Sequence, residues 1–144
     1  MSAALSPRLA AIVAALPLWP EARVLEIGCG PGAAARAVAE RLTSGHIRAT
    51  DRSASAIRQA RTACAEQLAT GRLSLRQVSA EELTLDDGEE PYDLVFAVRV
   101  GALDGRHPKA GELALRRIAA VTTPDARLYI DGGNPLRELT IPRS

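Results

Sequence analysis

The stretch from Arg23 to Arg41 constrains the fold of this chain more than any other part of its sequence. A short aliphatic run, Arg23–Ile27, stops at the segment Gly28-Cys29-Gly30-Pro31-Gly32, and residues 33–42 have the composition of a helix. A short apolar run bounded by glycine and proline is typical of a buried strand. The stretch therefore predicts a strand, a glycine loop and a helix in direct succession.

The same alternation of strand and helix continues along the chain. Hydrophobic periodicity predicts further strands at residues 46–50, 73–78, 92–98 and 126–130. It predicts helices at residues 9–16, 57–68 and 113–121, with a turn at 122–125. Alternating elements of this kind favour a doubly wound α/β domain, in which a mostly parallel sheet of about five strands carries helices on both faces.

The length and composition of the chain limit its class. The 144 residues fit a single domain spanning 1–144, and Leu136–Ile141 is the one further candidate strand. Without a full hairpin there, the fifth strand would be an exposed edge, so a homodimer through that edge is a hypothesis. The net charge of +1 and the aromatic content of 3% argue against a nucleic-acid partner.

Membrane and metal functions are also not expected. The most apolar N-terminal stretch, Leu9–Leu18, is too short to cross a bilayer, and it does not form a convincing signal peptide. The two cysteines and two histidines show no metal-site spacing. We therefore expect a cytoplasmic protein with no bound metal and no membrane partner.

The topology itself indicates where a ligand would bind. Open parallel sheets bind ligands beyond the carboxyl ends of their strands, at the point where strand order reverses. The segments expected to meet there are 26–32, 51–52, 79–81, 99–104 and 131–134.

The glycine loop narrows the ligand class. Gly28, Gly30 and Ala33 fit the pattern G-x-G-x-x-G/A, which several ligand classes share. Glu26 directly precedes the loop, where its carboxylate would repel a pyrophosphate and attract the ammonium and sulfonium groups of S-adenosylmethionine. Asp51, at the end of the second strand, suits the ribose hydroxyls of either S-adenosylmethionine or NAD.

Several segments together resemble one known family. Residues 24–32, Val-Leu-Glu-Ile-Gly-Cys-Gly-Pro-Gly, are similar to the first motif of class I S-adenosylmethionine-dependent methyltransferases. Residues 50–53 resemble the second-strand motif, 79–83 the adenine-side segment and 92–97 the fourth strand, and 115–131 resemble the helix, turn and strand that follow. The resemblance covers roughly residues 8–132. It implies a Rossmann-like methyltransferase fold that is C-terminally truncated, because the family's sheet usually continues with two more strands.

The resemblance also implies which residues bind the cofactor, S-adenosyl-L-methionine. The loop glycines would line the methionine moiety, with Glu26 at its amino end, and Asp51 would hold the ribose. Arg52 and Ala80 would border the adenine. The complete predicted cofactor set is Glu26, Gly28, Cys29, Gly30, Gly32, Asp51, Arg52, Ala80, Glu81 and Ala97.

The function predicted from these residues is in-line methyl transfer to a small-molecule acceptor. Alignment of methyl and acceptor can supply much of this catalysis, so an acid–base residue is optional. If the acceptor is a hydroxyl, His107 or Asp104 in the loop after the fourth strand is the candidate base. Two alternatives remain open: a non-catalytic cofactor-binding subunit or partner-dependent fragment, and an NAD-dependent oxidoreductase.

Other polar residues have simpler interpretations. Ser79 and Glu82 match an S-x-x-E capping box that would start a short helix. The acidic cluster Asp86–Glu90 is expected to be a solvated turn. His46 opens the second strand, at the end remote from the predicted site, so we expect a structural role.

Overall fold

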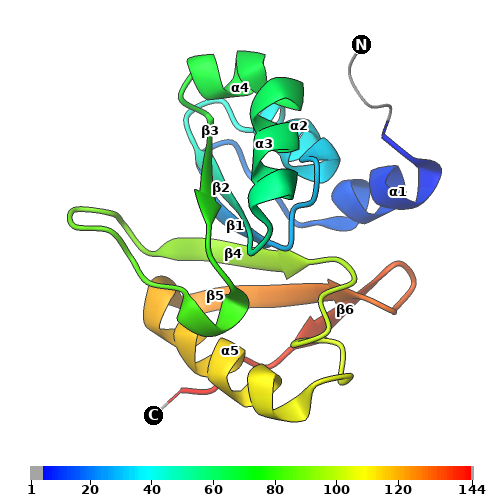
Figure 1. Ribbon diagram of the computed structural model, residues 1–144, viewed down its shortest axis with the longest axis vertical. Helices are drawn as coiled ribbons and strands as arrows, with labels where there is room; N and C mark the ends of the chain where they lie inside the picture. Colours follow the sequence, from blue (N-terminus) through cyan, green and yellow to red (C-terminus); the bar gives the residue numbers. More distant parts are fainter. Residues whose placement is uncertain (1–4, 144) are drawn as a thin grey trace.

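The computed structural model describes residues 5–143 and contains one six-stranded sheet in the order β3-β2-β1-β4-β5-β6 (Figure 1). The strands are β1 (Arg23–Ile27), β2 (His46–Asp51), β3 (Leu73–Gln77), β4 (Tyr92–Ala97), β5 (Thr122–Asp131) and β6 (Leu136–Leu139). The helices are α1 (Pro7–Ala15), α2 (Ala33–Ala39), α3 (Ala54–Ala63), α4 (Ala65–Ala69), the 3₁₀ helix η1 (Ala80–Glu82) and α5 (Pro108–Val121). Strands β1 to β5 are parallel and β6 is antiparallel. The predicted doubly wound fold is confirmed.

The sheet separates two hydrophobic clusters. Successive side chains of a strand point to opposite faces, so Val24 of β1 packs with α1, α2 and α3, whereas Leu25 and Ile27 pack with α5. Figure 1 shows α1 to α4 over one face and α5 over the other. Strands β1 and β4 lie at the centre of the sheet and are buried on both faces, as their nearly continuous apolar sequences predict.

Local capping residues set the starts of the helices on the first face. The Ser6 hydroxyl accepts a hydrogen bond from the Leu9 N–H at 3.2 Å, and Pro7 occupies the first turn of α1. The Ser53 hydroxyl caps α3 in the same way, by accepting from the Ala56 N–H at 3.2 Å. The cap of α3 therefore follows Asp51 by two residues, which keeps the end of β2 and the start of α3 close together.

The C-terminal part of the sheet differs from the prediction. Residues 122–125 do not form a free turn, because β5 already begins at Thr122 and its register against β4 shifts within this segment. The candidate strand at Leu136–Ile141 forms as β6 and pairs with β5, so the sheet has six strands instead of about five. The edge of β5 is therefore covered, and the exposed edge belongs to β6. The homodimer hypothesis loses its original premise and stays a prediction.

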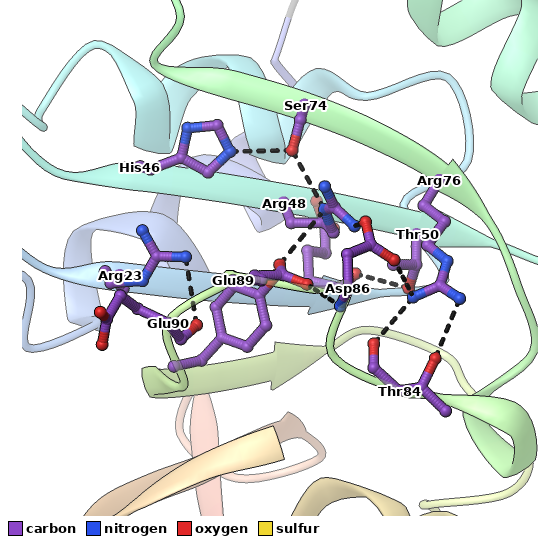
Figure 2. Close-up of polar contacts among 12 residues, drawn as sticks. Arg23, His46, Arg48, Thr50, Ser74, Arg76, Thr84, Asp86, Glu89 and Glu90 are labelled. Carbon is purple, nitrogen blue, oxygen red and sulfur yellow. Dashed lines mark hydrogen bonds and ion pairs between the residues drawn. The ribbon is translucent and has the colours of Figure 1, made fainter.

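The acidic cluster Asp86–Glu90 is a largely solvated turn, as expected, but two of its acids also contact arginines of the sheet (Figure 2). Arg48 lies on the sheet face opposite α2 and α3, and its guanidinium contacts Asp86 at 2.9 Å and Glu89 at 3.6 Å. Arg76 contacts the same Asp86 carboxylate at 3.5 Å, and the Tyr92 hydroxyl donates to Glu89. Asp86, Asp87 and Glu90 are exposed, whereas Glu89 is partly buried against Arg48. The turn is therefore solvated, and ion pairs attach it to β2 and β3.

His46 has the structural role expected of it. Its Nδ1 lies 2.8 Å from the Gly71 carbonyl oxygen and its Nε2 lies 2.8 Å from the Ser74 hydroxyl, far from the loops after the strands (Figure 2). Both ring nitrogens are therefore occupied within the sheet. Within residues 5–143, no helix is long and apolar enough to span a membrane.

Candidate functional site

Two cavities flank the glycine loop at the carboxyl ends of β1 and β4, where strand order reverses. The larger, of about 540 Å³, extends across the ends of β1 to β4 to the start of α5. The smaller, of about 240 Å³, lies between α1, the glycine loop and the start of α2. Gly28 and Arg99 line both cavities. The cavities therefore lie where the strand order predicted them, but none of the predicted residues 131–134 lines either cavity.

The backbone of the loop requires glycine at two positions for different reasons. Gly28 has a φ of 73°, and a Cβ there would lie 2.6 Å from Cγ2 of Val100. Gly32 has a φ of 91°, and a Cβ there would lie 2.8 Å from Sγ of Cys64. Gly28 keeps the wall between the cavities thin, whereas Gly32 lets α2 and α3 pack closely.

Glu26 is a buried acid with an unsatisfied oxygen. The residue is 3% exposed, it lines the smaller cavity, and its Oε1 has no hydrogen-bond partner among the described residues. Burial, together with the nearby charge of Asp51, raises the pKa of Glu26 to about 8. A buried carboxyl without a partner is costly unless a donor or a cation reaches it. The smaller cavity therefore fits a ligand group that carries a positive charge and N–H donors.

Asp51 connects the end of β2 to the glycine loop. Its Oδ2 accepts a hydrogen bond from the Gly30 N–H at 2.9 Å, and its Oδ1 accepts from the Ser53 N–H at 2.9 Å. These two bonds fix the carboxylate on the wall of the larger cavity. Each oxygen keeps a further lone pair for a hydroxyl donor.

The adenine-side residues predicted from the sequence line the larger cavity together. Arg52, Ala80 and Glu81 are among the lining residues, next to Ser79. The helix η1 begins at Ala80 as the capping-box pattern implies, but the Ser79 hydroxyl does not accept a hydrogen bond from a backbone N–H. Its hydroxyl instead donates to Oε1 of Glu82 at 2.9 Å.

Three predicted residues lie outside both cavities. Gly32 packs against α3, and Ala97 is 1% exposed in the core on the α5 side. Asp104 forms an ion pair with Arg106 at 2.8 Å, and this hydrogen bond lowers the pKa of the Asp104 carboxyl. An acid held in its ionised form by an arginine is a weak proton acceptor. His107, the other candidate base, does line the larger cavity.

Three further residues line the cavities: Cys29, whose thiol is not reactive, and two arginines that the sequence did not predict. Cys29 lines the smaller cavity, but burial and the charges of Glu26 and Asp51 raise the pKa of its thiol, which argues against a reactive thiolate. Arg8 and Arg106 also line the cavities but lay outside the segments predicted to form the site. No local sequence signal marks them, since only the folded chain brings α1 and residue 106 to the loop.

The fold and the site define a doubly wound α/β domain with a cleft at its topological switch point, an acid before the glycine loop and a second acid at the end of β2. Residues 24–125 match the model of the methyltransferase domain family, and the chain belongs to this family. The resemblance to class I S-adenosylmethionine-dependent methyltransferases is thereby confirmed. S-Adenosyl-L-methionine is the cofactor that this membership implies.

Solved structures share the fold. The chain is 26% identical to the [4+2]-cyclase SpnF, with a TM-score of 0.69, over 85% of this chain and 43% of that one. It is 21% identical to coclaurine N-methyltransferase bound to N-methylheliamine and SAH, with a TM-score of 0.67, over 85% and 34% of the two chains. It is 22% identical to the CcbJ methyltransferase from Streptomyces caelestis, with a TM-score of 0.66, over 85% and 47%.

The chain spans less than half the length of each of these three proteins. No curated protein matches the sequence significantly.

Proposed function

We propose that this domain binds S-adenosylmethionine across its two cavities and transfers the methyl group to a small-molecule acceptor. Glu26 carries the proposal, because a nearly fully buried carboxyl with an unsatisfied oxygen lines the smaller cavity beside the glycine loop. An α-ammonium would satisfy that oxygen, whereas a pyrophosphate would be repelled by it. The buried carboxyl of Glu26 therefore fits a sulfonium amino acid better than a dinucleotide.

The other polar groups fit the nucleoside part of the same ligand. The fixed Asp51 carboxylate has free lone pairs for two ribose hydroxyls on the wall of the larger cavity. Arg52, Ala80 and Glu81 would then border the adenine. In this assignment Gly28, which lines both cavities, lies between the amino acid part and the nucleoside part.

When bound, this cofactor would supply a methyl group on a positively charged sulfur, which the acceptor takes by in-line displacement while the sulfur leaves as a neutral thioether. The protein's contribution is to hold both reactants in line, and effective molarity from such positioning accounts for a large part of the rate. Residues 99–102 and 106–107 line the larger cavity, and we assign this side of it to the acceptor. If the acceptor is a hydroxyl, His107 is the side chain placed to take its proton, whereas Asp104 is engaged by Arg106.

The test of this proposal is product formation. The domain is incubated with methyl-labelled S-adenosylmethionine and a library of small acceptors, and transfer is followed by mass spectrometry. We expect labelled product from the wild type and a loss of at least tenfold in Asp51→Ala through weaker cofactor binding. His107→Ala is expected to lower turnover of a hydroxyl acceptor. No product from a chain that binds the cofactor would contradict the catalytic part of the proposal.

A second candidate function is cofactor binding without methyl transfer. Two observations favour keeping it: the chain spans less than half of its structural relatives, and one relative of the same fold is a [4+2]-cyclase. Calorimetric binding of S-adenosylhomocysteine together with an unchanged S-adenosylmethionine pool would support it. Competition by NAD would instead favour the oxidoreductase alternative.

A further inference from the structure

Arg99 has an unusual backbone at the centre of the site. Among residues 5–143 it is the only non-glycine residue with a positive φ, 58°, and it follows the end of β4 by two residues. It also lines both cavities. The backbone of a non-glycine residue is strained in this sparsely populated region. Such strain persists where neighbouring residues fix the backbone, often at ligand sites.

The surroundings fix Arg99 from both sides. Its N–H donates to Oδ1 of Asp131 at 2.9 Å, and its carbonyl accepts from Nη2 of Arg106 at 3.2 Å. Oδ2 of Asp131 accepts in turn from Nη2 of Arg8 at 2.7 Å. Residues of α1, of β5 and of the loop after β4 therefore together fix the backbone at Arg99.

The side chain of Arg99 is left unpaired by this arrangement. Within the described part of the chain, its guanidinium has no hydrogen bond and no ion pair, although Arg8 and Arg106 are both paired with acids. Arg99 is exposed and lines both cavities, so its guanidinium is available to a ligand that enters either of them.

The charge around Arg99 is asymmetric within the larger cavity. The side that carries Asp51 and Glu81 is acidic in part. The side formed by residues 99–110 contributes no lining carboxylate, and its charged lining residues are the unpaired Arg99 and Arg106, which pairs with Asp104. Asp104, the only acid of that loop, is not a lining residue. The N-terminus of the 14-residue helix α5 adds its positive dipole end to the same side, where Ala110 is a lining residue.

We infer that Arg99 selects the methyl acceptor, and that this acceptor is a small molecule bearing an oxyanion, a carboxylate or a phosphate monoester. The inference rests on the proposed function. The planar guanidinium matches either oxyanion with two parallel hydrogen bonds, and both groups gain from the adjacent dipole. A neutral acceptor would leave this charge unpaired, and a cationic acceptor would be repelled. Arg99 is thus a specificity-determining residue, held in place by Asp131 and Arg106.

The test uses a matched series of probes: benzoate, phenyl phosphate and the neutral benzamide. Each is titrated at constant ionic strength into the intact domain saturated with S-adenosylhomocysteine, and binding is followed by amide NMR shifts. We expect at least one of the two anions to bind at least tenfold more tightly than benzamide, with shifts at residues 99–102 and 110. The stronger anion identifies the oxyanion class.

Substitutions assign this binding to one side chain. Arg99→Gln is expected to weaken the anion at least tenfold and to change the dissociation constant of S-adenosylhomocysteine less than twofold. Arg127→Gln, at an exposed arginine of β5, is the control that should change neither. Arg99→Gly, which accepts the left-handed backbone without strain, gives the same expected result if the glutamine variant misfolds.

Three results would overturn the inference. These are equal binding of benzamide, no binding of either anion, and anion binding that survives in both Arg99 variants. A tenfold loss of S-adenosylhomocysteine affinity in Arg99→Gln would also overturn it, because Arg99 would then bind the carboxylate of the cofactor. If the wild type fails to bind S-adenosylhomocysteine, the proposed function fails instead, and the same anion titrations on the free domain still decide whether the oxyanion site exists.

Discussion

Raising the pH from 6 to 7.5 is expected to tighten the binding of S-adenosylhomocysteine roughly 25-fold through Glu26 alone. In the free domain this carboxyl is buried, has one unsatisfied oxygen and has its pKa raised to about 8, chiefly by burial. At pH 6 about one molecule in a hundred then has an ionised Glu26, and at pH 7.5 about one in four.

The roughly 25-fold change in affinity follows because the ligand binds only the ionised carboxylate of Glu26. An α-ammonium pairs with the carboxylate and not with the neutral acid, so each binding event at low pH must first remove the proton. The apparent dissociation constant is inversely proportional to the ionised fraction of Glu26, and its fall corresponds to about 2 kcal/mol over this range. Above pH 8 the dependence should flatten, because most free molecules are already ionised.

Calorimetry measures both parts of this linkage. Titrations at several pH values give the dissociation constant, and buffers of different ionisation enthalpy report close to one proton released per ligand bound at pH 6. Glu26→Gln is expected to abolish the slope and the proton release. His107→Gln is the control, since this residue lines the larger cavity; it should keep the slope. A dissociation constant that is independent of pH in the wild type would refute the reasoning.

Three further predictions concern the stability of the free domain. Because Glu26 keeps its proton when the domain is folded, the free energy of unfolding should fall as the pH rises from 4.5 to 8. Glu26→Gln should therefore stabilise the domain at pH 8 by on the order of 4 kcal/mol and change its stability little at pH 4.5, as measured by urea unfolding. Equal effects at both pH values would contradict this prediction. Gly32→Ala should lower stability by about 2–3 kcal/mol, because the new Cβ meets Cys64 and the left-handed backbone is strained, whereas Gly88→Ala, with the same backbone sign and open space, should lose only about 1 kcal/mol. Burial lowers the pKa of His46, so stability should be lost as the pH falls below about 6.5, and His46→Gln should weaken that acid dependence in thermal unfolding scans between pH 5 and 7.

The fold and the cofactor side of the site were predictable because their signals are local. The glycines that follow β1 and the acid that ends β2 report backbone turns and side-chain chemistry within a few residues of sequence. Parallel strand order then places the two segments at one edge of the sheet, so Glu26 and Asp51 could be predicted as neighbours in a candidate site before any contact was known.

The rest depends on contacts between distant segments. The start of β5 and the pairing of β6 are set by register across the sheet, which the turn-like residues 122–125 do not encode. The ion pairs of the solvated acidic turn likewise depend on Arg48 and Arg76, which belong to other elements of the chain. The left-handed Arg99 is held by side chains from other elements, so its conformation has no signal in its own sequence neighbourhood.

The central claim is that the cleft holds a sulfonium amino acid nucleoside and not a dinucleotide. Thermal unfolding of the free domain in the presence of S-adenosylmethionine, S-adenosylhomocysteine or NAD tests it most directly, because a ligand at 100 times its dissociation constant adds about 2.7 kcal/mol to stability. We predict stabilisation by the two sulfur ligands, none by NAD, and loss of the effect in Asp51→Ala. Stabilisation by NAD alone, or by none of the three ligands, would contradict the account.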